Sequence, residues 1–105
     1  MPSNATKDQL TIIAKIRAKA GMELRLREAL LALVAPTRAE SGCINYDLHV
    51  ARDNPREFVF YENWRSPADL DAHFKTPHMV AFFKNAHEML DGEADIARWT
   101  MLRGA

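Results

Sequence analysis

Hydrophobic and polar residues change their spacing several times along the chain, and each change predicts a new element. Residues 10–18 alternate weakly and are rich in β-branched side chains, which predicts a first strand. Residues 22–40 follow with apolar side chains at helical spacing, which predicts a helix. Pro36 lies inside this pattern and removes one helical hydrogen bond, so we expect a kink or an early end there. Gly42 suits the left-handed position that often follows a helix.

Two more strands are expected next, joined by a short turn. Residues 43–50 and 57–64 have the composition of strands, and the Arg-Asp-Asn-Pro sequence of residues 52–55 predicts a hairpin between them. The later of these two strands, residues 57–64, carries a carboxylate among aromatic residues, which is unusual because a buried carboxylate is costly without a partner. We therefore interpret this strand as the wall of a pocket. One face of it carries Phe58, Phe60, Glu62 and Trp64, and the other carries Val59 and Tyr61.

The last third of the chain contains two helix starts and a final strand. Ser66-Pro67 and Thr76-Pro77 each place a capping hydroxyl before a proline, a combination that favours the first turn of a helix. Residues 95–102 predict the fourth strand. The buried stripe that we expect on the second of these helices consists of Met79, Phe83, Ala86 and Leu90.

The order β-α-β-β-α-β predicts a ferredoxin-like α+β fold, in which an antiparallel sheet carries its helices on one face. Both faces of the third strand are apolar or aromatic, whereas a sheet that is covered on one side only has a polar face toward water. We therefore expect a second surface to cover the open face of the sheet.

Composition narrows the class of protein. The 105 residues predict one domain over residues 1–105, with polar residues 1–8 as a flexible arm that lacks the apolar core of a signal peptide. Fourteen basic and fourteen acidic side chains balance, so no overall field attracts nucleic acid or an anionic membrane. Cys43 is the only cysteine and cannot form an intramolecular disulfide. We expect a cytoplasmic protein that binds neither nucleic acid nor membrane.

Four short motifs occur in a fixed order and carry a family resemblance. They are Pro36-Thr37-Arg38-Ala39-Glu40-x-Gly42-Cys43, Tyr46-Asp47-Leu48, Tyr61-Glu62-x-Trp64 and His73-x-x-x-Pro77-His78. Over residues 10–102 the chain resembles the antibiotic biosynthesis monooxygenase family of small dimeric α+β barrel proteins, which includes quinol monooxygenases. The resemblance implies a homodimer whose two sheets pack face to face. It also implies an enzyme that needs no cofactor and oxidises an aromatic small molecule with dioxygen.

The resemblance and the residue chemistry together predict the catalytic groups. His49 matches a histidine of the family's phenol-oxidising members, and His49 or His73 could remove a phenolic proton, because imidazole titrates near neutral pH. Trp64 matches a family tryptophan and would stack on a planar substrate with its indole N–H free for a substrate oxygen. Glu62 would act as the base or orient a histidine. A purely structural Glu62 would instead pair with Arg17 or Arg98.

The expected substrate pocket has apolar walls. Related monooxygenases carry an asparagine where this chain has Phe60, so a donor that could polarise a substrate carbonyl is missing. The substrate-binding residues that we expect are Phe58, Phe60, His78, Phe82 and Phe83.

Metal and cofactor sites are not expected. His73 and His78 are five residues apart and do not share one helical face, and no cysteine or acidic residue completes a persuasive ligand set with them. His87 falls near the iron ligand of haem-degrading relatives of the fold, but Ile12 and His73 stand at the other two positions that such proteins need. A solvent-facing His87 is the simpler interpretation. The chain contains no GxGxxG motif and no phosphate loop, which argues against flavin.

The family resemblance implies two enzymatic functions, and a third hypothesis is non-catalytic. The first is a cofactor-independent monooxygenase that converts a quinol or polycyclic phenol to a quinone. The second is an isomerase or processing enzyme for a small phosphorylated hydroxy-carbonyl signal molecule, which needs cations such as Arg38, Arg52 or Lys75 in its pocket. The third is a dimer that binds a small molecule without turnover.

Overall fold

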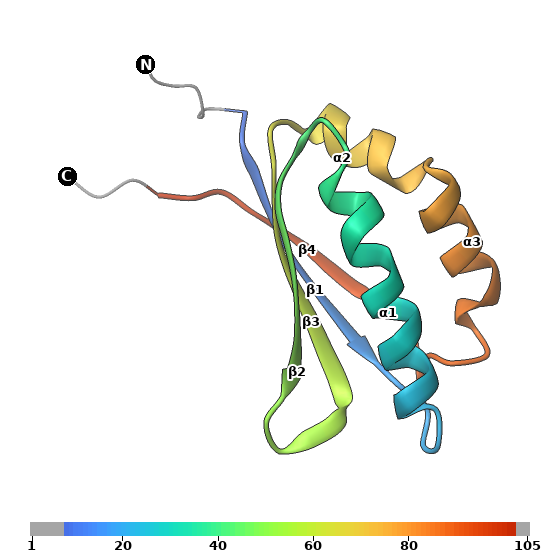
Figure 1. The fold of residues 1–105 in the computed structure, drawn as a ribbon. Coiled ribbons are helices and arrows are strands. Elements are labelled where there is room, and N and C mark those ends of the chain that lie inside the picture. The colour runs from blue at the N-terminus through green and yellow to red at the C-terminus, as the bar shows by residue number, and fades with distance from the viewer. Residues whose placement is uncertain (1–7, 103–105) are drawn as a thin grey trace.

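Residues 8–102 are described by a computed structural model, in which four strands form one sheet and three helices lie together on one face of it (Figure 1). Residues 1–7, nearly all of the predicted arm, lie outside the described residues, as do residues 103–105. No helix within residues 8–102 is long and apolar enough to cross a bilayer. In chain order the elements are β1 (Leu10–Arg17), α1 (Glu23–Arg38), β2 (Cys43–Ala51), β3 (Asn54–Trp64), α2 (Pro67–Phe74), α3 (Pro77–Ala86) and β4 (Asp95–Trp99).

The sheet has the strand order β2-β3-β1-β4, and every neighbouring pair is antiparallel. This order confirms the predicted ferredoxin-like fold. The two long central pairings, β2 with β3 and β1 with β3, put β3 in the middle of the sheet. Side chains of β3 therefore decide what lies beneath the helices and what lies on the uncovered face.

Strand β3 separates two environments, as its alternation predicts. Phe58, Phe60, Glu62 and Trp64 are all buried on the helix-covered face. Tyr61 lies on the opposite face and is 42% exposed. Paired residues of β1 follow the same alternation, since Ile12 pairs with buried Glu62 and Ile13 pairs with Tyr61. The covered face is thus the core, and the opposite face has no cover within residues 8–102.

Helix α1 continues through Pro36, where a kink or an early end was expected, and ends at Arg38, two residues before the predicted end at residue 40. The expected role of Gly42 is wrong, because only Gly21 and Gly92 among the described residues have a positive φ. Gly42 is needed for space: a Cβ on it would collide with the side chain of Asp69 at the start of α2. Close packing of the loop after α1 against α2 therefore requires glycine at this position.

Hydroxyl caps begin α2 and α3 as expected. The Ser66 hydroxyl accepts a hydrogen bond from the backbone N–H of Asp69 at 3.2 Å, and the Thr76 hydroxyl accepts one from Met79 at 3.4 Å. These caps satisfy amide groups that have no partner within the helix, and they fix where each helix begins.

The buried stripe of α3 differs from the prediction at one position. Met79 and Ala86 are buried, but the aromatic residue between them on the inner face is Phe82. Phe83 is 42% exposed and lies at the edge of the helix layer. The spacing of three and then four residues along α3, rather than four and then three, selects Phe82 for the core.

Candidate functional site

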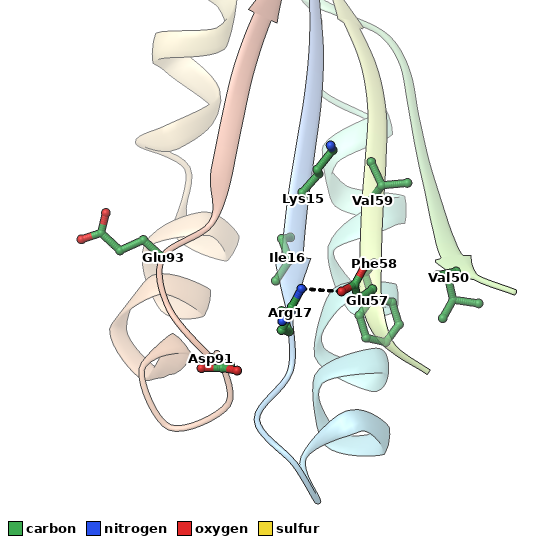
Figure 2. A pocket seen from close by; sticks show the side chains of 10 residues that line it. Lys15, Ile16, Arg17, Val50, Glu57, Phe58, Val59, Asp91 and Glu93 are labelled. Atoms are coloured by element: carbon green, nitrogen blue, oxygen red, sulfur yellow. Dashed lines mark hydrogen bonds and ion pairs between the residues drawn. The ribbon is translucent and has the colours of Figure 1, made fainter. Parts of the chain in front are cut away.

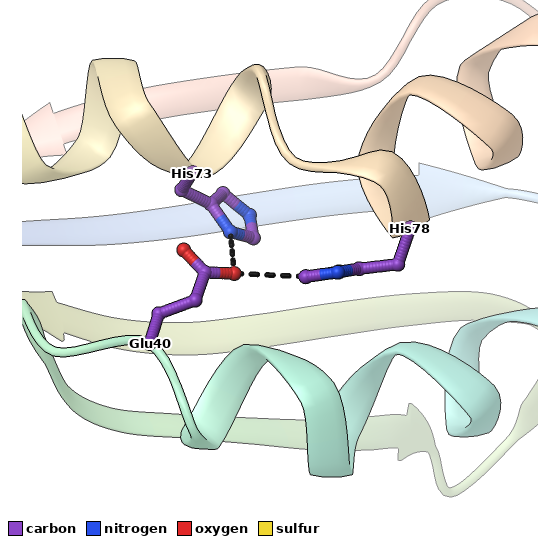
Figure 3. A group of neighbouring side chains, drawn as sticks. All are labelled: Glu40, His73 and His78. Carbon is purple, nitrogen blue, oxygen red and sulfur yellow. Dashed lines mark hydrogen bonds and ion pairs between the residues drawn. The ribbon is translucent and has the colours of Figure 1, made fainter.

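Two histidines and one carboxylate meet in the helix layer (Figure 3). One oxygen of Glu40, Oε2, lies 2.9 Å from Nδ1 of His73 and 2.8 Å from Nε2 of His78. Because an ionised carboxylate can only accept hydrogen bonds, both ring nitrogens donate to the same oxygen. This arrangement leaves the other ring nitrogen of His73, Nε2, on the side away from Glu40 (Figure 3).

Each member of the cluster comes from the end of a different element. Glu40 lies two residues beyond the end of α1, and its backbone N–H donates to the carbonyl of Thr37 at 3.0 Å. His73 is in the last turn of α2 and His78 is in the first turn of α3. The capped helix start at Thr76 lies between the two histidines, and its hydroxyl lies 3.2 Å from Nε2 of His78. The short turn between α2 and α3 thus brings both rings to Glu40.

His73 is the most enclosed member of the cluster, with 1% of its surface exposed. Its ring centroid lies 4.6 Å from that of Trp64 and 5.6 Å from that of Tyr46. Burial lowers the pKa of His73, although the hydrogen bond and the charge of Glu40 act in the opposite direction. The imidazole is therefore neutral at neutral pH, with its proton on Nδ1 and a lone pair on Nε2.

Glu62 and Trp64 form a second buried pair. The indole N–H of Trp64 donates to Oε1 of Glu62 at 2.8 Å. Burial raises the pKa of Glu62 to about 7, the hydrogen bond from Trp64 opposes this change, and the charge of Glu40 adds to it. Arg17, one of the two expected arginine partners, pairs with Glu57 instead. The partner of Glu62 is Trp64, so the indole N–H is not free for a substrate oxygen.

A small cavity of about 30 Å³ lies between the sheet and the helices, next to these groups. Glu62 and His73 are its ionisable lining groups, and Tyr46 adds a phenol whose pKa is raised by burial and by the charge of Glu62. Phe83 and Ile96 line it and are exposed, so they mark its opening. The remaining lining is apolar: Ala14, Ile16, Leu30, Leu33, Phe60, Phe74, Met79, Phe82 and Ala94.

The expected site residues divide into groups by position. Phe60, Phe82 and Phe83 line the cavity together with Glu62 and His73. Trp64 is fully buried beside His73 and does not line the cavity. His78 does not line it either, and is linked to the lining residue His73 by the shared oxygen of Glu40.

His49 lies apart from all of these residues. It pairs with Val59 on the uncovered face of the sheet and is exposed. Its Nδ1 lies 3.2 Å from the carbonyl oxygen of Asp47 on its own strand. The sheet therefore separates the two histidines that the sequence offers as alternative bases.

A larger cleft of about 490 Å³ lies toward the opposite end of β3 (Figure 2). Phe58 lines it, beside the ion pair between Arg17 and Glu57, in which the nitrogen and oxygen are 2.6 Å apart. It contains none of the histidines and neither Trp64 nor Glu62. Its size alone does not make it the site, because the groups suited to acid–base chemistry surround the smaller cavity.

Sequence reasoning assigned no role to Glu40 or Tyr46, although both stand in the motifs quoted above. Glu40 follows the last turn of α1, where helical spacing no longer predicts a direction for its side chain. Tyr46 alternates correctly with the buried face of β2, and its ring stacks on Phe60 with centroids 4.3 Å apart. The alternation of β2 could have placed Tyr46 in the pocket. No local pattern could have placed Glu40.

His87 caps the C-terminus of α3 and is exposed, as the simpler interpretation predicts.

Comparison with known proteins matches the chain to a family. The model of the family described as "Antibiotic biosynthesis monooxygenase" matches residues 9–85. The Escherichia coli protein named "Probable quinol monooxygenase YgiN" is 36% identical over 85 residues, covering 70% of this chain and 80% of that protein. The Mycobacterium tuberculosis protein named "Putative monooxygenase Rv0793" is 36% identical over 81 residues, covering 77% of this chain and 79% of that protein.

The structural comparison agrees with the family match. The crystal structure of PA3566 from Pseudomonas aeruginosa has a TM-score of 0.89 and 37% identity, covering 95% of this chain and all of that one.

A Synechocystis protein, sll1783, is 29% identical in sequence over 89 residues, but this chain spans only 60% of the length of that protein.

Proposed function

We propose that this chain, which belongs to the antibiotic biosynthesis monooxygenase family and is thus of the monooxygenase type, oxidises a quinol or polycyclic phenol with dioxygen at the cavity beside His73. The observation that carries this proposal is the buried, neutral His73, whose Nδ1 is held by Glu40 while its ring lines an apolar cavity. A base of this kind needs a lone pair and a fixed ring, and the Glu40 hydrogen bond supplies both.

The proposed reaction needs few protein side chains. Nε2 of His73 takes the phenolic proton, and the electron-rich anion passes one electron to dioxygen. The substrate radical and superoxide combine into a ring peroxide anion, which takes the proton back from Nε2 of His73, and the resulting hydroperoxide loses water to leave a quinone. One oxygen atom of dioxygen ends in the quinone and the other in water. The apolar walls keep bulk water from the anion while it forms.

Substrate binding requires the cavity to open, because about 30 Å³ holds roughly one water molecule. Phe83 is the side chain whose movement would enlarge it, since it lines the cavity and is still 42% exposed. Its neighbours Phe74 and Phe82 stay in the layer behind it, with ring centroids 6.1 and 5.5 Å from that of Phe83. We propose that a flat aromatic substrate takes the place of the Phe83 ring against these residues.

Oxygen uptake tests this proposal directly. Metal-stripped protein is incubated with a panel of reduced naphthoquinols and anthrones, and uptake is compared with heat-killed protein, because such compounds oxidise spontaneously. Uptake well above the heat-killed control, and lost in His73→Gln, is expected. A folded protein that gives no excess uptake across the panel would contradict the proposal.

We also propose that the active form is a homodimer whose sheets pack face to face. The uncovered face carries Tyr61 and Trp99, which are 42% and 54% exposed, beside the half-buried Ile13 and Val59. Sedimentation of Tyr61→Glu tests this, with Leu24→Glu on the solvent side of α1 as the matched control. Only the Tyr61 variant is expected to sediment as a monomer, because the charge would be buried without a partner.

The phosphorylated-substrate alternative has less support. Arg38 is engaged with Asp47 at 3.0 Å and with the carbonyl of Tyr46 at 3.2 Å, outside the cavity. The residues that line the small cavity within the described part of the chain include no lysine or arginine. A phosphate there would lie beside Glu62 without a compensating cation.

A further inference from the structure

The Glu40–His73–His78 cluster has the composition of a metal site as well as of a hydrogen-bonded base. We propose that these three side chains bind one divalent transition-metal ion of the zinc type, with His73 Nδ1, His78 Nε2 and Glu40 Oε2 as ligands. The proposal goes beyond the oxygenase reaction, which uses the metal-free protein.

The three ligand atoms already converge. They lie within 4.8 Å of one another, and each nitrogen is within 2.9 Å of the carboxylate oxygen. Ligands on one zinc ion, with bonds of about 2.0–2.1 Å, stand roughly 3.0–3.4 Å apart. The two nitrogen–oxygen separations are close to this range. Binding therefore needs the two imidazole nitrogens to move toward one another, and the carboxylate can stay in place.

The ligand chemistry selects the class of ion. Two imidazoles and one carboxylate suit zinc and neighbouring first-row ions, whereas magnesium and calcium prefer oxygen ligands. Three protein ligands leave a further position for water. The Thr76 hydroxyl, 3.2 Å from His78 Nε2, can hold such a water molecule.

The surroundings allow the ion to reach the site and hold the ligands still. His73 is closed off, but the side chains of His78 and Glu40 are 21% and 15% exposed. The helix cap at Thr76 fixes the first turn of α3, which presents His78, and His73 is held by its burial in the core. A site that is rigid on one side and open on the other is suited to an exchangeable ion.

Metal binding and base catalysis exclude one another at His73. An ion on Nδ1 forces the ring proton onto Nε2, so the nitrogen that would accept the phenolic proton becomes a donor. Zinc occupancy would therefore switch off the proposed oxidation, without blocking the cavity itself.

Equilibrium dialysis and calorimetry with metal-stripped protein test the site independently of any activity. Wild-type protein is expected to bind one Zn²⁺ per chain, to bind Co²⁺ with a new visible absorption band, and to ignore Mg²⁺. Glu40→Gln and His78→Ala are expected to weaken zinc binding by about 100-fold or more, since even partners outside the ligand set cost about 10–100-fold. The matched control is His87→Ala, which removes an exposed histidine at the other end of α3.

The outcomes are separable. The proposal is overturned if folded wild-type protein does not bind zinc. It is also overturned if the wild type, Glu40→Gln and His78→Ala bind zinc equally well, because the ion would then lie elsewhere. Circular dichroism of both variants confirms that they are folded. In the oxygen-uptake assay, inhibition that follows zinc occupancy is expected, and full activity of zinc-saturated protein would overturn the competition at His73. If no oxygen uptake exists, the binding result still decides whether the metal site is real.

Discussion

The two faces of the sheet carry similar residues in opposite roles. On the covered face, Trp64 is fully buried, donates to Glu62 and supports the ring of His73. On the uncovered face, Trp99 is 54% exposed, and the His49 side chain has a hydrogen-bond partner only on its own strand within the described residues. We conclude from this difference that residue type alone does not identify the candidate site in this fold. What identifies it is a second layer, in which α2 and α3 bring polar groups to buried partners.

Exchange of each histidine for glutamine should show the largest contrast between the faces. His73→Gln is expected to lower the rate of oxygen uptake by about 10²–10⁴-fold, because it removes a positioned base while keeping most of the side-chain volume. His49→Gln is expected to change it far less, since its ring faces away from the cavity. Steady-state uptake at several substrate concentrations separates kcat from KM. A larger loss in the His49 variant would move the chemistry to the other face.

The two tryptophans should differ in their effect on stability. Trp64→Ala is expected to lower the free energy of unfolding by about 3–5 kcal/mol, because it empties a fully buried site and leaves Glu62 without its donor. Trp99→Ala is expected to lower the free energy of unfolding of the dilute monomer by no more than about 0.5 kcal/mol. Urea unfolding at two protein concentrations measures both. A concentration-dependent cost at Trp99 would itself support the dimer, and equal costs in dilute protein would abolish the contrast.

Glu62 should make stability depend on pH in a defined direction. Its pKa is raised from 4.5 to about 7 in the folded protein, so the folded state binds the proton more tightly than the unfolded state does. The contribution is favourable below about pH 4.5 and is lost as the pH rises through about 7. The full loss is about 3 kcal/mol for a shift of this size.

Comparison with Glu62→Gln isolates this effect. The difference in unfolding free energy between the wild type and the variant is measured from pH 4.5 to 8, with other ionisable groups common to both proteins. The wild type is expected to lose stability relative to the variant across this range. A constant difference would mean that Glu62 keeps its ordinary pKa despite being 4% exposed.

Much of the fold follows from local patterns. The period of two in β3 predicts correctly that Phe58, Phe60, Glu62 and Trp64 are buried, because successive residues of a strand point to opposite faces. Asn63, on the opposite face, is buried as well and departs from this period. The caps at Ser66 and Thr76 predict correctly where α2 and α3 begin, because the hydroxyl and the proline act within a few residues. Where the prediction was wrong, at Gly42, the deciding contact is with Asp69, far along the chain.

The candidate site could be predicted only in part. Three of the expected site residues, His73, Glu62 and Phe60, line the cavity, and aromatic and ionisable residues on the buried face of a strand or in a short helix are visible in the sequence. The expectation that no set of metal ligands is present rested on spacing in the sequence, and it overlooked Glu40. This residue is 33 positions from His73 and 38 from His78, yet it contacts both.

By itself the sequence determined the elements, their order and the two faces of β3, because these depend on the periodicity of side chains and on capping within a few residues. Tertiary structure alone decided that Glu40, His73 and His78 share one oxygen, and that His49 lies on the other face from them. It also decided that Glu62 takes its hydrogen bond from Trp64 rather than from an arginine. The physical reason is that hydrogen bonds between buried side chains depend on which elements pack together, and packing joins residues that no local spacing connects.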